Sequence, residues 1–195
     1  MRAALLETIP GQLVIDDVTI GTVGPRDVVV RTVAAGLCHS DLHFMHGSYF
    51  CPLPAVLGHE SAGVVERVGA DVTHVRPGDH VITCISGFCG QCRFCLQGRP
   101  NLCDHIAITP PPDAPARLTR NGTPVFQFMG LSSFAEEILV HENYVVKIRP
   151  DMPLDKAALI GCGVTTGIGA VVNTARVRPG ETVAVIGCGG IGLNA

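Results

Sequence analysis

Residues 89–103 read CGQCRFCLQGRPNLC, and this stretch contains four cysteines: Cys89, Cys92, Cys95 and Cys103. The spacing C-x2-C-x2-C-x7-C supplies four thiolates from one short loop that has neither helix nor strand periodicity. Four thiolates around one point form a closed tetrahedral site suited to zinc, with no position left for a substrate. The stretch therefore predicts a structural zinc lobe, and we expect the chemistry elsewhere in the chain.

Paired disulfides, an iron site, an iron–sulfur cluster and chance spacing are the alternatives for these four cysteines. The chain has nine cysteines, an odd number, and Glu7 interrupts the apolar N-terminal stretch MRAALLETIPG, which does not resemble a secretory signal. Disulfides persist mainly in oxidising compartments. We therefore expect reduced thiols, zinc and a cytoplasmic location.

The composition disfavours two classes of partner. A net charge of −3, an aromatic content of 5% and the lack of a lysine- or arginine-rich run argue against nucleic-acid binding. The uncharged stretch Ala157–Ala175 could suggest a membrane span, but its glycines, threonines and asparagine favour a helix packed in a domain interior. Neither nucleic acid nor a membrane is expected as a partner.

Short apolar runs between turn signals predict a mainly β protein, a barrel, over residues 3–146. After Pro153 the pattern changes, because residues 154–175 predict a helix or an interrupted helix and Thr182–Ile186 predicts a buried strand of a parallel sheet. The strand candidates of the barrel are Leu13–Ile15, Val28–Val33, Ser61–Val68, His80–Thr83, Ser133–Val140 and Tyr144–Ile148.

A glycine-rich turn, Gly187 to Gly192 (GCGGIG), directly follows the apolar run Thr182–Ile186. Between a strand and a helix, a G-x-G-x-x-G turn lets the backbone approach the pyrophosphate of a dinucleotide at the helix N-terminus. A plain glycine-rich turn is the alternative, since the confirming acidic residue, about 20 positions later, lies past Ala195. Gly187, Gly189 and Gly192 are the candidate cofactor residues.

A second set of candidate metal ligands lies outside residues 89–103. Cys38 and His59 fit the mixed cysteine and histidine set of a catalytic zinc site, which keeps one position open. Cys162 could be the third ligand, although a cysteine is more often a small buried residue and a histidine beside a glutamate a surface pair. The sequence alone does not separate Cys162 from Cys51, Cys84 and Cys188.

Six segments in order resemble the zinc-dependent alcohol dehydrogenases of the medium-chain dehydrogenase/reductase superfamily. The GHE element, the four-cysteine stretch and the GCG segment are the most specific of them. The segments are GLCHSDLHFMHG (36–47), LGHESAGVVERVG (57–69), PGDHVI (77–82), CGQCRFCLQGRPNLC (89–103), ALIGCGVTTGIGA (158–170) and VRPGETVAVIGCGGIG (177–192).

The resemblance implies a GroES-like catalytic barrel domain over residues 1–163 and the start of an α/β Rossmann cofactor domain over residues 164–195. Members of the family continue well past this length, so we expect the chain to be the N-terminal part of a longer enzyme and to lack a complete nicotinamide pocket by itself. NAD or NADP is the implied cofactor, and a homodimer or homotetramer is the implied full-length assembly.

The resemblance also implies two zinc ions per chain. Cys38, His59 and Cys162 would hold the catalytic zinc, with Glu60 as a carboxylate that can approach it. The structural zinc would be held by Cys89, Cys92, Cys95 and Cys103.

Four residues near Cys38 match the family's proton and cofactor positions. Ser40 would take the proton of the alcohol, and His43 would pass it to solvent through the cofactor ribose. His39 would lie near the cofactor pyrophosphate, and Asp41 would orient the ring of His59. Zinc lowers the pKa of an alcohol, and hydride then passes to the nicotinamide.

The substrate implied is a primary or aromatic alcohol, oxidised to its aldehyde. Relatives that act on glutathione–formaldehyde adducts carry an arginine where this chain has Ala107, and commonly a tyrosine at the position of His43. An S-(hydroxymethyl)glutathione dehydrogenase-like enzyme and a non-catalytic zinc-binding module are the alternatives, and the complete ligand set argues against a zinc-free quinone-reductase- or crystallin-like relative. Ile85 and Phe134 are expected to line the pocket or the barrel core.

Overall fold

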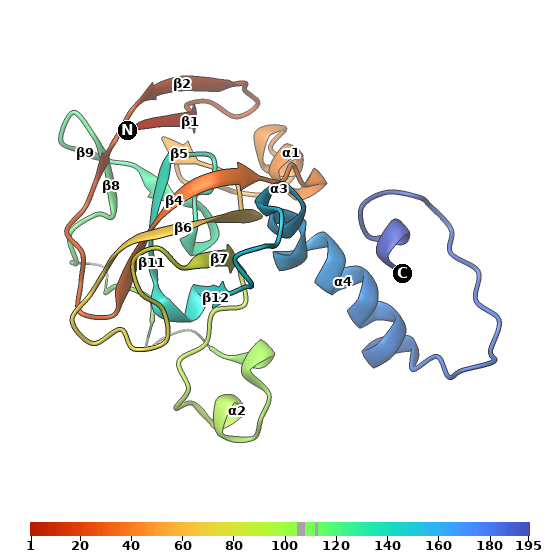
Figure 1. Cartoon of the computed structure of the whole chain (residues 1–195). Coiled ribbons are helices and arrows are strands. Elements are labelled where there is room, and N and C mark those ends of the chain that lie inside the picture. Colours follow the sequence, from red (N-terminus) through yellow and green to blue (C-terminus); the bar gives the residue numbers. More distant parts are fainter. Residues whose placement is uncertain (105–107, 112) are drawn as a thin grey trace.

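The structure is a computed structural model that describes residues 1–104, 108–111 and 113–195. A curved five-stranded sheet and a four-stranded sheet form a half-barrel, and a small three-stranded sheet extends one side of it (Figure 1). The mainly β fold predicted for the first part of the chain is confirmed. The strands are β1 (Arg2–Leu6), β2 (Leu13–Asp17), β3 (Thr19–Ile20), β4 (Asp27–Ala35), β5 (Ala55–Val56), β6 (Ser61–Val68), β7 (His80–Thr83), β8 (Leu118–Arg120), β9 (Thr123–Pro124), β10 (Phe126–Gln127), β11 (Glu137–His141) and β12 (Val145–Lys147).

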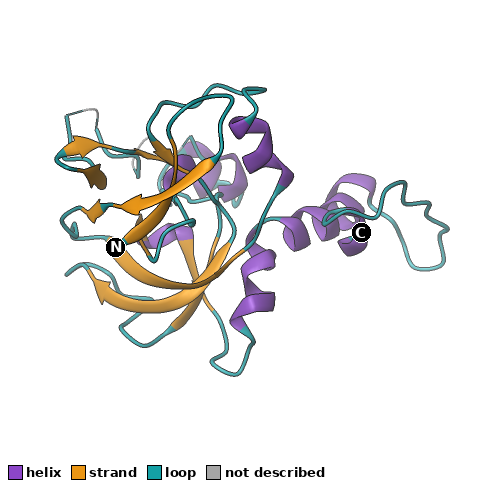
Figure 2. Ribbon diagram, turned by 90° about the horizontal axis from the view of Figure 1, so that it is seen from above, coloured by secondary structure: helices purple, strands orange, loops and turns teal. Residues whose placement is uncertain are grey.

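Helices occupy the connections between strands and the C-terminal part of the chain (Figure 2). The α-helices are α1 (His39–Met45), α2 (Arg93–Leu96), α3 (Leu154–Ala157) and α4 (Gly163–Gly169). The shorter or irregular helices are η1 (Pro100–Leu102), η2 (Phe128–Gly130), η3 (Glu142–Tyr144), η4 (Ala158–Gly161), the π-helix η5 (Ala170–Ala175) and η6 (Gly192–Asn194).

The five-stranded sheet has the order β11-β4-β6-β7-β12, with every neighbouring pair antiparallel. Strand β4 is rich in valine, which suits a pleated surface, and it pairs with β6 across two register shifts. Such irregularities increase the local twist and bend a strand, so they help to curve the sheet into a half-barrel.

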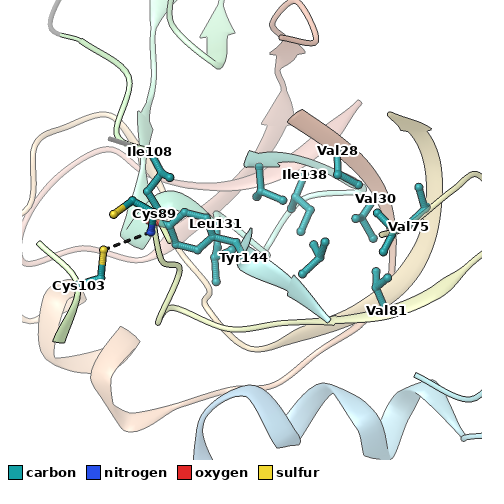
Figure 3. Packing of buried hydrophobic residues seen from close by; sticks show 13 residues of the cluster. Val28, Val30, Val75, Val81, Cys89, Cys103, Ile108, Leu131, Ile138 and Tyr144 are labelled. Atoms are coloured by element: carbon teal, nitrogen blue, oxygen red, sulfur yellow. Dashed lines mark hydrogen bonds between the residues drawn. The ribbon is translucent and has the colours of Figure 1, made fainter. Parts of the chain in front are cut away.

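The main core lies inside this curved sheet and continues without interruption to the four-cysteine stretch. Figure 3 shows Val28, Val30 and Ile138 in the same cluster as Tyr144 and Cys89. Cys89 and Cys103 therefore connect the lobe (residues 89–103) to the barrel core, and the lobe, which carries α2 and η1, protrudes from the barrel (Figure 1).

Gly87 forms the close contact between this lobe and the barrel. A Cβ at Gly87 would lie 2.6 Å from Cζ of Tyr144, and the Cys84 N–H donates a hydrogen bond of 2.9 Å to the carbonyl oxygen of Tyr144. The backbone before the lobe thus lies directly against the Tyr144 ring.

The sequence predicted most barrel strands closely. Ser61–Val68 and His80–Thr83 match β6 and β7, whereas the run Ser133–Val140 is a strand only from Glu137 onward. The left-handed backbone of Ser132, with φ of 59°, turns the chain before that strand begins.

Two expectations for the C-terminal part are wrong. Residues 154–175 are helical and interrupted, as predicted, and the break lies at Cys162, but α4 and η5 project from the barrel, and Ile168 and Val172 are 51% and 60% exposed. Thr182–Ile186 is not a strand, since no described residue supplies a hydrogen-bonded partner strand for it. An apolar run becomes a strand only when a neighbour pairs with it.

No single described helix is long and apolar enough to cross a membrane. The helices at Leu154–Gly161 and Gly163–Ala175 meet that test of length and composition only as a pair, with an angle of 51° between them.

Candidate metal centres

The four cysteines of the lobe bring their sulfur atoms to the spacing of a tetrahedron. The Sγ of Cys92 lies 3.6 Å from that of Cys95 and 3.9 Å from that of Cys103, and the Cys89 and Cys95 sulfurs are 4.0 Å apart. Zinc–sulfur bonds of about 2.3 Å give a tetrahedron with edges of about 3.8 Å, whereas a disulfide needs about 2.05 Å. The spacing fits a zinc ion and excludes disulfides between these pairs.

Backbone N–H groups of the lobe point at its sulfur atoms. The N–H of Cys92 donates to the Sγ of Cys89 over 3.2 Å, and the N–H of Cys89 donates to the Sγ of Cys103 over 3.3 Å (Figure 3). Hydrogen bonds of this kind stabilise thiolates. Backbone hydrogen bonding, first of all from Cys95, lowers the pKa of Cys92 to about 6, and burial together with the neighbouring thiols raises the pKa of Cys95 to about 11.

A second cluster joins ligand types from three distant parts of the chain. The potential ligand atoms of Cys38, His59, Glu60 and Cys162 all lie within 4.8 Å of one another, and we call this group the mixed centre. Cys38 caps the N-terminus of α1, His59 and Glu60 directly precede β6, and Cys162 lies between η4 and α4. The two centres are the only such groups of potential metal ligands among the described residues.

The structure also separates Cys162 from the other three candidate cysteines. Cys51 is buried and donates a hydrogen bond of 3.4 Å to the carbonyl oxygen of Pro52, and Cys188 is exposed. Neither of them, nor Cys84, belongs to a described cluster of potential ligands.

Asp41 is hydrogen-bonded to both Cys38 and His59, the first two potential ligands of the mixed centre along the chain. Its Oδ1 accepts hydrogen bonds from the Gly58 N–H and from Nδ1 of His59, both at 3.1 Å, and its Oδ2 accepts the Cys38 N–H at 3.3 Å. With Nδ1 engaged, Nε2 of His59 is the nitrogen left for a metal. The expected contact between Asp41 and His59 is therefore present.

The charge of the mixed centre favours a cation. Burial lowers the pKa of His59, but the hydrogen bonds with Asp41 and Cys162 outweigh burial, so its pKa is raised to about 11. The hydrogen bond with His59 lowers the pKa of Cys162, but burial and the charge of Cys38 outweigh it and raise that pKa. Thiols and carboxylates that favour a protonated imidazole so strongly would favour a divalent cation as well.

The predicted proton-transfer residues lie on α1, next to the mixed centre. Ser40 and His43 are half-buried and three residues apart, so they lie on the same side of the helix. The ring of His43 packs edge-on against those of His39 and Tyr49, at centroid distances of 4.7 Å and 5.8 Å. The helix itself was not predicted.

The glycine turn forms only a short helix start. Gly187 has a left-handed backbone with φ of 103°, and the N–H of Leu193 donates to the carbonyl oxygen of Gly189 over 2.9 Å. The turn packs against α4 near Gly167, where a Cβ would lie 2.5 Å from the carbonyl oxygen of Ile191.

The two residues expected to line the pocket or the barrel core differ in burial, and the position that distinguishes glutathione-adduct enzymes is not described. Phe134 is partly buried against two core clusters, while Ile85 is 36% exposed. Ala107 lies outside the described residues. A cavity of about 530 Å³, lined among others by Pro52, Ile108 and Arg117, contains no member of either metal centre.

Three residues beside the mixed centre were not predicted from the sequence: Gly36, Ser61 and Thr83. A Cβ at Gly36 would lie 2.3 Å from Oε2 of Glu60, and the Ser61 and Thr83 hydroxyls are buried 2.8 Å from each other. For Gly36 and Ser61 the only signal in the sequence is that each lies within two residues of a candidate ligand.

Known proteins share this fold and match this chain in sequence. Residues 24–150 match the alcohol dehydrogenase GroES-like domain family. The chain belongs to the alcohol dehydrogenase family. The resemblance to zinc-dependent members of the medium-chain dehydrogenase/reductase superfamily is thereby confirmed.

Curated alcohol dehydrogenases match nearly the whole chain. It is 40% identical to the class-P alcohol dehydrogenase of Arabidopsis thaliana over 189 residues, which is 94% of the chain and 50% of that protein. It is 45% identical to the class-3 alcohol dehydrogenase of Zea mays over 187 residues, 93% of the chain and 49% of that protein. The chain thus spans about half the length of the curated relatives it matches.

Solved alcohol dehydrogenase structures have the same arrangement. The alcohol dehydrogenase zinc-binding domain protein of Burkholderia ambifaria superposes with a TM-score of 0.91 at 38% identity, over 99% of the chain and 54% of that structure. The benzyl alcohol dehydrogenase of Acinetobacter calcoaceticus gives a TM-score of 0.89 at 34% identity, over 99% of the chain and 53% of that structure.

Proposed function

We propose that this alcohol dehydrogenase chain provides the catalytic metal-binding part of an enzyme that oxidises a primary or aromatic alcohol to its aldehyde, with NAD or NADP as hydride acceptor. The observation that carries the proposal is the mixed centre, with two thiols, one imidazole and one carboxylate within 4.8 Å. This ligand set is typical of a catalytic zinc site, in which three protein ligands leave one position for a substrate.

Each residue of the mixed centre has its own task in this proposal. Cys38, His59 and Cys162 hold the zinc, and Asp41 fixes the His59 ring through its Nδ1. A zinc ion held there supplies Lewis-acid chemistry that lowers the pKa of an alcohol hydroxyl.

Ser40 and His43 move the proton of the alcohol. Ser40 follows Cys38 by two residues, which places its hydroxyl on the first turn of α1 beside the centre, and it accepts that proton. His43 lies on the same side of α1, half-buried, and carries the proton towards solvent. Glu60 is the carboxylate that approaches the metal in this proposal.

The name of the Acinetobacter relative supports an aromatic alcohol as the substrate class. The glutathione-adduct alternative needs a cation to pair with a glutathione carboxylate, and position 107 is an alanine. The structural relative from Helicobacter pylori, solved with NADP(H) at 27% identity, supports a nicotinamide cofactor. Gly187, Gly189, Gly192 and His39 are the residues proposed to meet it.

The proposal includes two zinc ions per chain, one in the lobe and one in the mixed centre. It divides the chain into a catalytic domain, residues 1–163, and the start of the cofactor domain, residues 164–195. A cytoplasmic homodimer or homotetramer remains the expected full-length form, and thiol ligands kept reduced for zinc are consistent with the cytoplasm.

The test is alcohol-dependent reduction of NAD or NADP by a polypeptide that carries this sequence at the length of its curated relatives. Benzyl alcohol and ethanol are the substrates, and Ser40→Ala should lower kcat about 100-fold or more, as expected for loss of the proton acceptor. Ser48→Ala, just beyond α1 and exposed, is the matched control and should keep normal turnover. Turnover that survives Ser40→Ala, or needs no zinc, contradicts the proposal.

A further inference from the structure

We propose that Gly161 is a positioning residue whose contact with the Thr83 carbonyl sets how far Cys162 reaches into the mixed centre. The inference rests on the proposed function, because it takes Cys162 as a metal ligand. It explains how a cysteine that follows the barrel in sequence comes to lie beside two potential ligands from the early part of the barrel, Cys38 at the start of α1 and His59 before β6.

The backbone of Gly161 lies against the end of strand β7. A Cβ at Gly161 would be 1.9 Å from the carbonyl oxygen of Thr83 and 3.7 Å from Cα of Cys84. Gly161 is buried and its φ is outside the left-handed region, so its backbone conformation does not demand glycine. Glycine is required at position 161 because its backbone lies too close to Thr83 to leave room for a side chain.

Thr83 is itself held next to the segment that carries His59 and Glu60. Its Oγ1 lies 2.8 Å from the Ser61 hydroxyl, and both side chains are buried. Ser61 begins β6 directly after Glu60 and His59. One chain of contacts, from Ser61 through Thr83 to Gly161, therefore connects the segment that carries His59 with the segment that carries Cys162.

The rest of the segment before Cys162 also packs against the barrel, and Ile160 is partly buried against the same cluster as Ala157 and Ala158. Ala157 and Ala158 are buried against Ala62 and Ile82, one turn earlier. Cys162 itself lies between two helices with φ of −137° and ψ of −80°, outside the helical region. Gly161 is the last residue before Cys162 with a direct contact to the barrel.

The effect of adding one carbon atom at Gly161 follows from this geometry. A carbon–oxygen contact needs about 3.5 Å rather than 1.9 Å, so the backbone of Gly161 would have to retreat by more than about 1 Å. Metal ligands must be held within about 0.5 Å of the productive geometry. Gly161→Ala should therefore move Cys162 out of reach while leaving its thiol chemically intact.

Gly163 offers a matched control on the other side of Cys162. A Cβ there would meet its nearest atom, the carbonyl oxygen of Gly190, at 3.8 Å, which is an ordinary contact. The two variants make the same chemical change one residue before and one residue after the same ligand.

The experiment is titration of the metal-free 195-residue chain with Co²⁺, followed through the thiolate charge-transfer and visible ligand-field bands of each centre. The wild type and Gly163→Ala should bind two equivalents. Gly161→Ala should bind Co²⁺ at the mixed centre roughly 10- to 100-fold more weakly, with the lobe bands unchanged. Cys162→Ala provides the spectrum of a mixed centre that lacks its third ligand.

The outcomes separate the inference from the proposed function. If Cys162→Ala leaves both sets of bands intact, the mixed centre itself is refuted. If Cys162→Ala loses one set but Gly161→Ala binds Co²⁺ like the wild type, only the positioning role is refuted.

A second variant covers the case in which Gly161→Ala also loses the lobe bands and so does not fold. Ser61→Ala removes the hydroxyl that holds Thr83 without adding any atom, and it should weaken Co²⁺ binding roughly threefold at the mixed centre alone. Unchanged binding in Ser61→Ala would then overturn the inference.

Discussion

The two candidate metal centres are built in opposite ways. All four ligands of the lobe lie within residues 89–103, whereas the mixed centre draws Cys38, His59 and Cys162 from the N-terminal third, the barrel and the segment beyond it. The lobe needs only a short loop to close around the ion. The mixed centre needs α1, the end of β7 and the start of α4 to be in place together, so its geometry depends on the completed barrel.

The largest effect is expected for Cys103→Ala, which tests whether the lobe also supports the barrel. Zinc-binding free energies of about 10–16 kcal/mol for four-ligand peptides average about 3 kcal/mol per ligand, so lobe affinity should fall at least roughly a hundredfold. Because Cys103 and Cys89 belong to the main core, Tm should fall as well. Metal analysis should find one equivalent instead of two, and an unchanged Tm would show that the lobe is independent.

Cys162→Ala should cost the mixed centre a similar factor of affinity but leave the core intact, because Cys162 belongs to none of the core clusters that the described residues form. Metal analysis and calorimetry on the same sample measure both effects. Two retained equivalents, or a loss of Tm as large as that of Cys103→Ala, would break the contrast between the centres.

Gly87→Ala tests the contact between lobe and barrel without touching a ligand. The added methyl group would overlap the Tyr144 ring, which should destabilise the chain by about 1–3 kcal/mol in urea unfolding. Gly190→Ala, where a Cβ meets no atom within 4 Å, is the control and should leave stability unchanged. Equal stability of the two variants would show that the lobe is only loosely attached.

The smallest effect is expected for Glu142→Gln, which separates barrel stability from metal binding. Burial raises the pKa of Glu142, but hydrogen bonds from Arg26, at 2.5 Å, and from His74, at 2.9 Å, outweigh burial and lower it. A lowered carboxyl pKa stabilises the fold above the usual glutamate range, and this contribution is lost as pH falls through the lowered pKa.

At neutral pH, Glu142→Gln should therefore be less stable by about 1–2 kcal/mol, and the difference should shrink on acidification below the usual glutamate range. Both proteins should keep two metal equivalents at neutral pH. A difference in stability that does not change with pH, or a lost metal, would contradict this assignment.

The two centres also differ in how far the sequence predicts them. The lobe follows from local spacing, because four cysteines in one loop can face one ion whatever the rest of the chain does. The third ligand of the mixed centre could not be chosen from spacing, since four isolated cysteines were equivalent until β7 and η4 were packed together. The family resemblance, not the residue pattern, singled out Cys162.

The errors have the same physical origin. Strands β6 and β7 were predicted because their alternation and apolar content are local, but Thr182–Ile186 depends on partner strands and has no regular secondary structure. Helix α1 was missed because its sequence, HSDLHFM, gives only a weak apolar periodicity. Asp41 stabilises it by accepting the Cys38 N–H, a contact that also serves the mixed centre.

The distance in sequence between Cys38 and Cys162 has a consequence for protein synthesis. A growing chain exposes all four lobe cysteines well before Cys162 has been translated, so the lobe can acquire its ion while the barrel is still forming. The mixed centre can be filled only after the segment that follows β12 has reached Thr83. Occupancy of the mixed centre would therefore report that the barrel has formed, and metal shortage during translation would leave chains with metal in the lobe and none in the mixed centre.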